Sequence, residues 1–306
     1  MKILISGGAG FVASHIIDLL LKTRNNNILA IDNFSTGKFS NIAPFTEKHG
    51  DRFNICEGDI TDLPFTIRTF NSFKPEYVIH LAAQPAISTS IMNPVFDNEV
   101  NVVGTLNIIN ASCNVEAKKI IFSSTSAVYK DINGKLNESS QTLPDSPYGI
   151  SKLAAENYLR LDGKATILRF GNVYGENQVP IGENQLIPRI IRHFKYGDEF
   201  YINGDGNQKR DFVYAGDVAQ AVVNALYCPP GLFNIASGNS LSVNDICRIM
   251  EDLYDIRGYK WDHNSIEDPR KVVKINISKA RSELSWKPYT PIREGIKKTM
   301  DWWEEK

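Results

Sequence analysis

Hydrophobic residues in the first half of the chain gather in short unbroken runs, and longer stretches with helical spacing separate these runs. Unbroken apolar runs are typical of strands that are covered on both faces. Strands that alternate with helices predict an α/β protein with a doubly wound parallel sheet. The runs that we interpret as strands are Ile3–Ile5, Ile28–Ile31, Phe53–Cys56, Tyr77–Leu81, Lys118–Phe122 and Ala165–Phe170.

The pattern changes after Gly171, where a long turn-rich stretch begins. We expect a second, smaller α/β domain there, with one segment returning to the first sheet. The first domain is expected to comprise residues 1–171 and about 206–236, and the second residues 172–205 and 237–306. The expected elements are helices at Leu186–Tyr196, Val218–Leu226, Val243–Tyr254 and Ile292–Trp303, and strands at Phe200–Ile202, Phe233–Ala236 and Val272–Ile277.

Composition narrows the class of protein. The 306 residues are 42% hydrophobic with a formal net charge of −1, which gives no electrostatic case for a nucleic acid or an anionic membrane as partner. No apolar segment approaches the roughly 18 residues that a membrane-spanning helix needs. The four cysteines are far apart and the five histidines form no metal-like pair. We therefore expect a cytoplasmic protein with reduced thiols and no metal site.

A glycine-rich turn follows the first strand and provides the strongest chemical signal. Gly7, Gly10 and Ala13 form a Gly-x-x-Gly-x-x-Ala turn that leads into a helix. Such a turn brings backbone close to a pyrophosphate, which the helix N-terminus then attracts. Asp32 ends the next strand 22 residues after Gly10, where an acid can bind a ribose diol and repel a 2′-phosphate. The pattern predicts NAD rather than NADP, and a tight turn with no ligand is the alternative.

Other strand ends extend this expected NAD site. The loop after Asp32 would pass the adenosine ribose, and small residues after the strand at 77–81 would let a flat cofactor approach. Asn101 is polar on an otherwise apolar helix, and either a cofactor contact or a backbone hydrogen bond would explain it. The residues that we expect to contact NAD are Gly7, Gly10, Phe11, Val12, Asp32, Asn33, Ser35, Thr36, Gly37, Lys38, Asp59, Ile60, Leu81, Ala82, Ala83, Gln84, Asn101, Ser123, Tyr148 and Lys152.

A tyrosine and a lysine lie four residues apart, at 148 and 152, and so share one helical face. An ammonium beside a phenol favours the phenolate, so we expect the pKa of Tyr148 to fall from about 10 toward neutrality. That would make Tyr148 a usable general base. Four hydroxyl residues precede this helix in the segment SSTSAVY, and at least one is expected to face the site.

Taken together, these motifs resemble those of the extended short-chain dehydrogenase/reductase family, and most closely nucleotide-sugar epimerases of the UDP-glucose 4-epimerase type. The resemblance rests on GGAGFVASH, DNFSTGK, HLAAQ, SSTSAVY, YGISK, RFGNVYG, GDGNQKRDFVYAGDVA and SKARSELSWKP. It implies an NAD-binding Rossmann domain and a C-terminal domain that binds a nucleotide sugar, with UDP-sugars as the expected substrates. It also implies a homodimer formed through the helices at 94–112 and 146–161.

The resemblance also assigns roles residue by residue. Tyr148 would be the catalytic base, Lys152 its partner and ribose ligand, and Thr125, four residues before the Tyr of the "VY" pair, the catalytic hydroxyl. It implies no metal. The residues that it places on the substrate are Thr125, Tyr148, Asn172, Tyr201, Asn203, Arg210 and Arg270.

The residues after Thr125 discriminate within the family. Sugar 4,6-dehydratases that resemble this chain carry an Asp-Glu pair there and UDP-glucuronate decarboxylases a Glu, whereas this chain has Ser126 and Ala127. This difference favours inversion at C4 through a transient 4-keto sugar. A reductase or C2-epimerase, or a non-catalytic nucleotide-sensing protein, are the alternatives. Gly171 replaces an aromatic residue common in epimerases, which suggests a roomier pocket.

Overall fold

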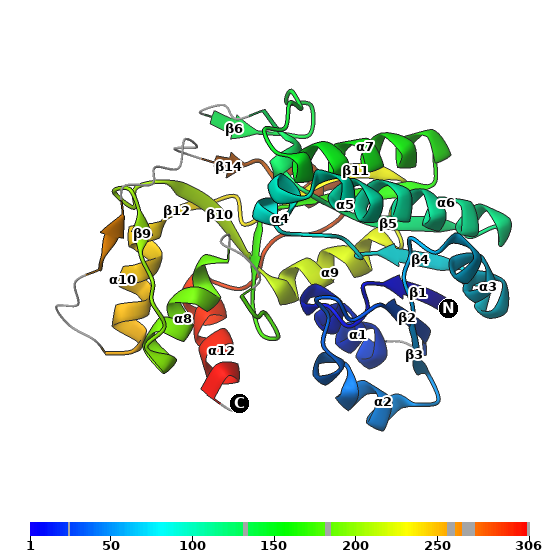
Figure 1. The fold of residues 1–306 in the computed structure, drawn as a ribbon, viewed down its shortest axis with the longest axis horizontal. Coiled ribbons are helices and arrows are strands. Elements are labelled where there is room, and N and C mark those ends of the chain that lie inside the picture. The colour runs from blue at the N-terminus through cyan, green and yellow to red at the C-terminus, as the bar shows by residue number, and fades with distance from the viewer. Residues whose placement is uncertain (24, 131–133, 181–184, 256–260, 265–272, 305–306) are drawn as a thin grey trace.

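The computed structural model describes residues 1–23, 25–130, 134–180, 185–255, 261–264 and 273–304. Within these ranges, the centre is a seven-stranded sheet in the order β11-β7-β5-β4-β1-β2-β3 (Figure 1). Every neighbouring pair in it is parallel, which confirms the predicted doubly wound sheet. The strands are β1 (Lys2–Ser6), β2 (Asn27–Asp32), β3 (Phe53–Glu57), β4 (Tyr77–His80), β5 (Lys119–Thr125), β7 (Ala165–Phe170) and β11 (Gly231–Ile235).

The strand order reverses between β1 and β4, because the chain runs from β1 outward to β3 on one side and from β4 outward to β11 on the other. Ligands of open α/β sheets bind outside the carboxyl ends of the strands at such a reversal. The predicted glycine turn follows β1 and the small residues at 82–83 follow β4. The topology therefore brings these two segments to the same point.

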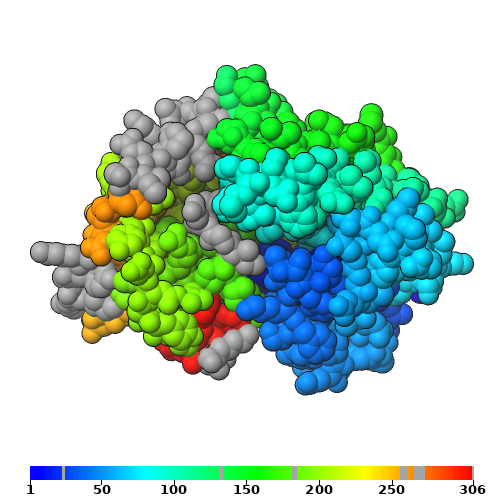
Figure 2. Space-filling model, in the orientation of Figure 1, coloured from blue at the N-terminus to red at the C-terminus, as the bar shows by residue number. Residues whose placement is uncertain are grey.

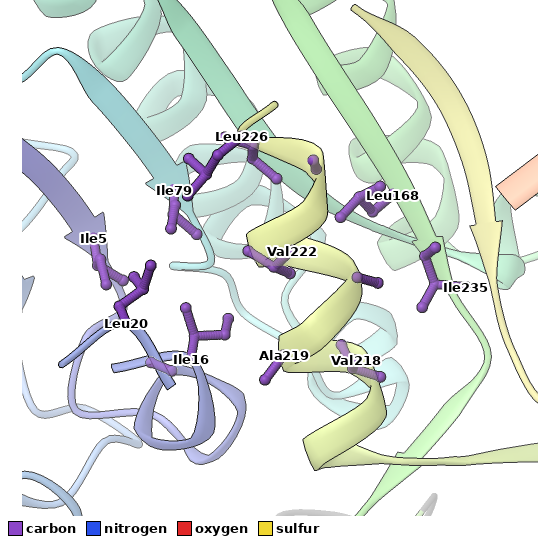
Figure 3. Packing of buried hydrophobic residues seen from close by; sticks show 14 of the residues in the cluster. Ile5, Ile16, Leu20, Ile79, Leu168, Val218, Ala219, Val222, Leu226 and Ile235 are labelled. Carbon is purple, nitrogen blue, oxygen red and sulfur yellow. The ribbon is translucent and has the colours of Figure 1, made fainter. Parts of the chain in front are cut away.

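Helices cover both faces of the sheet (Figure 1). On one face, α1 and α9 pack side by side, and Ile16 and Val222 point toward Ile5, Ile79 and Leu168 of the strands (Figure 3). The opposite face carries a second apolar cluster. The first face has α1 (Phe11–Thr23), α2 (Ala43–His49) and α9 (Ala215–Ala225), and the second α3 (Leu63–Phe73), α5 (Pro94–Asn98), α6 (Gly104–Asn114) and α7 (Pro147–Asp162).

The helical stretch expected at 94–112 is interrupted. Between α5 and α6, residues Glu99–Val103 form a π-helical turn that contains Asn101. A π turn inserts one residue into the α-helical ladder and frequently occurs at functional sites. The next helix, α7, has clean ends, since the Ser146 hydroxyl accepts the Gly149 N–H at 3.2 Å and Gly163 closes it at φ 72°.

The remaining residues build smaller sheets and a separate hydrophobic core beside the carboxyl end of the main sheet (Figure 1). The predicted helix at Leu186–Tyr196 is confirmed, whereas the strand expected at Phe200–Ile202 lies at Ile202–Asn203. Val272 lies outside the described residues. The elements are β8 (Asn172–Tyr174), β10 (Lys209–Tyr214), β12 (Ser240–Ser242), β9 (Ile202–Asn203), β13 (His263–Asn264), β6 (Gly134–Leu136), β14 (Val273–Ile275), α4 (Ile87–Met92), α8 (Leu186–Tyr196), α10 (Val243–Leu253), α11 (Ser278–Glu283) and α12 (Ile292–Glu304), with 3-10 turns at Phe39–Asn41 and Ser126–Val128.

The apolar face of α8 is buried against α10 and α12, through Ile190, Ile246 and Ile296 among others. In α10, Ser242 and Asp245 form a capping box that fixes the first turn. All four cysteines are unpaired. In the part of the chain that the structure describes, no helix is both long and apolar enough to cross a membrane.

Candidate active site

The glycine turn after β1 is packed too tightly for side chains. Gly7 has a φ of +71°, and a Cβ there would lie 2.7 Å from the backbone nitrogen of Ala82. At Gly10, a Cβ would lie 3.0 Å from the Gly7 carbonyl oxygen. The turn therefore holds bare backbone beside the first turn of α1, whose free N–H groups attract a phosphate.

Asp32 is fixed by the backbone around it. Its Oδ2 accepts the Ala9 N–H at 2.9 Å and its Oδ1 accepts the Phe34 N–H at 2.8 Å. Burial raises the pKa of this carboxyl, and the two hydrogen bonds oppose that rise. A Cβ at Gly37 would lie 2.8 Å from Asp32 Oδ1, so the loop after β2 closes over the carboxylate. The bare glycine cradle and the fixed acid fit the pyrophosphate and a ribose of NAD.

A cavity of about 480 Å³ runs along these carboxyl ends of the strands. Its walls include, outside the predicted set, Asn41, Thr89, Asn177 and Gln178. The predicted cofactor residues that line it are Gly7, Gly10, Phe11, Val12, Asp32, Asn33, Ser35, Thr36, Asp59, Ile60, Leu81, Ala82, Ala83 and Gln84.

Six predicted cofactor residues do not line this cavity, and one of them, Tyr148, lines a second cavity described below. Gly37 lies behind Asp32, and Lys38 donates its N–H to the Ala9 carbonyl at 3.0 Å. Ser123 donates its hydroxyl to the His80 carbonyl at 3.2 Å. The other two, Asn101 and Lys152, are buried behind the wall. In this structure, the side chains of Asn101 and Lys152 act on the cavity through the residues that they contact.

A second cavity, of about 380 Å³, adjoins the first and shares Phe11, Pro85 and Gln178 with it. It also contains cations and polar groups that the sequence analysis did not single out, among them Lys130 and Arg189. Arg270 lies outside the described residues. The predicted substrate residues that line the second cavity are Thr125, Tyr148, Asn172, Tyr201, Asn203 and Arg210.

Tyr148 and Thr125 both line the second cavity, and the Thr125 side chain is close enough to the phenol to act on its pKa. Burial, together with the smaller effect of Asp97, raises the pKa of Tyr148 to about 12 against the lowering effect of Thr125. The protein's own groups therefore raise the pKa of Tyr148, and the expected fall of this pKa toward neutrality is wrong. Burial also lowers the pKa of Lys152 to about 7, opposed by Glu156 and Asp97. Because both side chains are desolvated, the neutral forms of Tyr148 and Lys152 are more favoured than the sequence suggested.

The lysine ammonium is positioned by a ring. Lys152 Nζ lies 4.2 Å from the centroid of Phe122, a fully buried residue of β5. A cation over an aromatic face is stabilised most where water is excluded. Phe122 therefore holds the ammonium within the sheet, one helical turn from Tyr148.

Asp97, which the sequence analysis missed, anchors a buried polar cluster behind Tyr148. Its carboxylate accepts hydrogen bonds from Ser151 Oγ at 2.6 Å, Gln84 Nε2 at 2.7 Å and Asn101 Nδ2 at 3.1 Å. Neutral donors can hold a buried carboxylate ionised. The cluster ties α5 and the π turn to α7 and to the loop after β4.

Gly171 does not open the pocket in the way we expected. A Cβ at this position would lie 2.9 Å from the Asp211 carbonyl oxygen and 3.2 Å from Ala236 Cβ. The missing side chain thus admits neighbouring backbone, and the expectation of extra room in that direction is wrong. In the described part of the chain, no three His, Cys, Asp or Glu side chains are grouped to hold a metal.

Comparison with known proteins gives a consistent result. Residues 3–236 match the model of the NAD dependent epimerase/dehydratase family. A putative UDP-glucose 4-epimerase of Methanocaldococcus jannaschii is 38% identical over 98% of this chain and 97% of its own length. A dTDP-D-glucose 4,6-dehydratase of Mus musculus is 32% identical over 99% of this chain and 89% of its own. The crystal structure of UDP-glucose 4-epimerase from Thermotoga maritima with UDP-glucose superposes with a TM-score of 0.93, at 31% identity, covering 100% of this chain and 99% of that one.

Proposed function

The chain belongs to the NAD-dependent epimerase/dehydratase family, and we propose that it inverts C4 of a nucleoside diphosphate sugar, with UDP-glucose and UDP-galactose as the first candidates. The observation that carries this proposal is the proximity of Tyr148 and Thr125 in the second cavity, which adjoins the cofactor cavity. One cavity has the glycine cradle, and the other contains Arg210 and Asn172, which suit a diphosphate.

Each residue of the site has a separate role in the proposed reaction. The turn at Gly7 and Gly10 and the carboxylate of Asp32 hold NAD, which when bound supplies a hydride acceptor for C4 and a positive charge that favours the phenolate. Tyr148 takes the proton of the sugar 4-hydroxyl and later returns it, while Thr125 hydrogen-bonds the reacting oxygen.

Tethering by the diphosphate explains how one base can serve both faces of the sugar. Arg210 and Asn172 hold the phosphates and leave the 4-keto sugar to rotate between proton removal and proton return. Lys152 stabilises the phenolate through its charge before the proton is removed and again after it is returned.

Dehydration at the same site is disfavoured. Ser126 and Ala127 border the second cavity directly after Thr125, and neither side chain can act as an acid or a base. Despite the sequence similarity to the mouse dehydratase, groups for proton transfer at C5 and C6 are therefore lacking at these positions of this chain.

The test is incubation of the purified protein with a panel of UDP-sugars, with product stereochemistry followed by NMR. Equilibration of UDP-glucose with UDP-galactose, without net consumption of NAD, supports the proposal. Stoichiometric oxidation of NADH selects a reductase, and inversion at C2 selects a C2-epimerase. A protein that binds NAD but converts none of the sugars is a nucleotide-sensing protein.

We also propose the domain division at residues 171–172, with 206–236 returning to the first domain, and a homodimer formed through the helices expected at 94–112 and 146–161, which are α5, α6 and α7. The pairing of β11 with β7 supports the return of the chain. Several apolar side chains on α5 and α7 are exposed, and the segments lie side by side on the face seen in Figure 2, in cyan and green. The exposed side chains are Val95, Phe96, Ile150, Tyr158 and Leu161.

A further inference from the structure

A buried ion pair lies beneath the catalytic residues. Glu156 of α7 is fully buried, and its carboxylate accepts hydrogen bonds from Arg169 of β7 at 2.8 Å (Nε to Oε1) and 2.6 Å (Nη2 to Oε2). Arg169 is also buried, and its guanidinium lies 4.6 Å from the ring centroid of Tyr129. Removing one partner of such a pair leaves an uncompensated buried charge, so the pair is retained as a unit.

The same carboxylate contacts the strand that carries the catalytic hydroxyl. Ser124 Oγ donates to Glu156 Oε1 at 2.5 Å, and Ser124 directly precedes Thr125 in β5. The orientation of the strand end, and with it the direction of the Thr125 side chain, is therefore tied to Glu156. This bond also accounts for one of the four hydroxyl residues in the segment 123–126.

Glu156 is aligned with the catalytic pair along the helix. Tyr148, Lys152 and Glu156 follow one another at intervals of four residues, so they lie on one face of α7 in successive turns. Lys152 is 2% exposed, and no water layer screens its charge from the carboxylate one turn away.

Few charged or titratable groups face Lys152. These are Glu156 from α7, Asp97 from α5, and His80 from β4, whose pKa burial and Lys152 lower to about 3, so that it is neutral. Burial depresses the pKa of Lys152, and the two carboxylates oppose that effect. Glu156 and Asp97 are thus the groups that favour the ammonium.

We infer that Glu156 is a positioning residue for the proposed reaction: through Ser124 it orients Thr125, and through its charge it keeps Lys152 protonated beside Tyr148. The inference rests on the proposed function for its kinetic consequence only. Its electrostatic part concerns the titration of Tyr148 and Lys152, which is measurable without any substrate.

The test compares Glu156→Gln with Glu76→Gln, a surface carboxylate-to-amide control that breaks the Lys118 pair at the amino ends of β4 and β5. A double variant, Glu156→Gln with Arg169→Leu, removes the whole ion pair and guards against misfolding of the single variant. Each NAD-loaded protein is titrated by ultraviolet difference spectroscopy, with Tyr148→Phe in the same background as the reference, so that the signal reports the Tyr148 phenolate alone.

We expect the phenolate to appear at a pH about one unit higher in both Glu156 variants, because the neutral lysine no longer favours it. The control is expected to titrate like the unmodified protein. In turnover of UDP-glucose, kcat of the Glu156 variants should fall at least tenfold and the acid limb of its pH profile should move to higher pH, with KM little changed. A folded Glu156 variant with an unshifted phenolate titration would overturn the inference. Absence of turnover in the unmodified protein would instead overturn the proposed function, and the titration would still decide the role of Glu156.

Discussion

The side-chain amide of Asn101 pairs with both polar groups of the Gln84 backbone. Asn101 Oδ1 accepts the Gln84 N–H at 2.9 Å, and Asn101 Nδ2 donates to the Gln84 carbonyl at 3.2 Å. The π turn that carries Asn101 thereby satisfies the backbone of Gln84, as a neighbouring strand would. Gln84 belongs to the loop after β4, and this loop forms a wall of the cofactor cavity. Of the two explanations open from the sequence, the structure shows the backbone hydrogen bonds.

Replacing Asn101 by Ala should loosen this wall. The Gln84 N–H and C=O would lose their buried partners, which costs about 1–3 kcal/mol of stability. We expect urea unfolding to show that loss and the purified protein to retain less NAD, measured after denaturation. Asn224→Ala is the control, since Asn224 also donates to backbone carbonyls, those of Leu284 and Ser285, but lies away from both cavities. Equal loss of NAD in both variants would contradict this account.

Tyr148→Phe should abolish most turnover while leaving the fold and NAD content intact. The phenyl ring keeps the packing but has no proton to exchange, and loss of a positioned acid-base group costs about 10²–10⁴ in kcat. Tyr158→Phe, on an exposed turn of the same helix, provides the control and should retain full activity. Steady-state kinetics on UDP-glucose make the measurement, and an undiminished kcat in Tyr148→Phe would rule out the phenol as the base.

Two glycines with nearly equal φ separate backbone strain from steric fit. Gly7 and Gly163 have φ values of 71° and 72°, but a Cβ at Gly163 meets nothing within 4 Å. Gly163→Ala should cost about 1 kcal/mol, the usual penalty for a left-handed alanine. Gly7→Ala should cost more and weaken NAD binding at least tenfold, because its Cβ would collide with the Ala82 backbone. Thermal unfolding and NAD titration test this, and equal behaviour of the two variants would exclude the steric argument.

The elements that the sequence predicted correctly are those with a strong local signal. Apolar runs located the strands of the main sheet, and the hydrophobic stripe of α8 gave both of its ends. The turn at Gly7 was recognisable because bare backbone there requires particular residues at fixed spacing. The π turn at 99–103 was not predicted because inserting one residue into a helix barely changes the periodicity of its apolar positions.

The buried polar groups of the site had no such signal. Asp97 and Glu156 lie on helices, where acids are ordinary surface residues, and only the assembled fold shows that they are buried. The direction of the Tyr148 pKa shift was mispredicted for the same reason, since spacing places Lys152 beside the phenol but does not report how far either is desolvated. Local sequence predicts neighbours along a helix, and burial is a property of the tertiary structure.

The proposed dimer can be tested on its most exposed apolar positions. Val95 on α5 is 75% exposed, and a glutamate there would place a charge in the interface. We expect Val95→Glu to shift the protein from dimer to monomer in size-exclusion chromatography with light scattering. Tyr289→Glu, an exposed residue on none of the three helices, should leave the dimer unchanged. A monomeric unmodified protein would refute the proposal.

Asp211, beside the proposed phosphate ligand Arg210, should make stability depend on pH. It is fully buried, and burial raises its pKa from 3.8 to about 6 although Ser237 and the Gly238 N–H donate hydrogen bonds to it. An acid with a raised folded-state pKa favours the native state below its unfolded pKa and loses that contribution as the pH rises through 6. The difference in unfolding free energy between the unmodified protein and Asp211→Asn should therefore fall by about 3 kcal/mol between pH 4 and 7. Urea unfolding at several pH values measures it. A pH-independent difference would show that Asp211 has the same pKa in both states, since the amide's altered hydrogen bonds contribute equally at every pH.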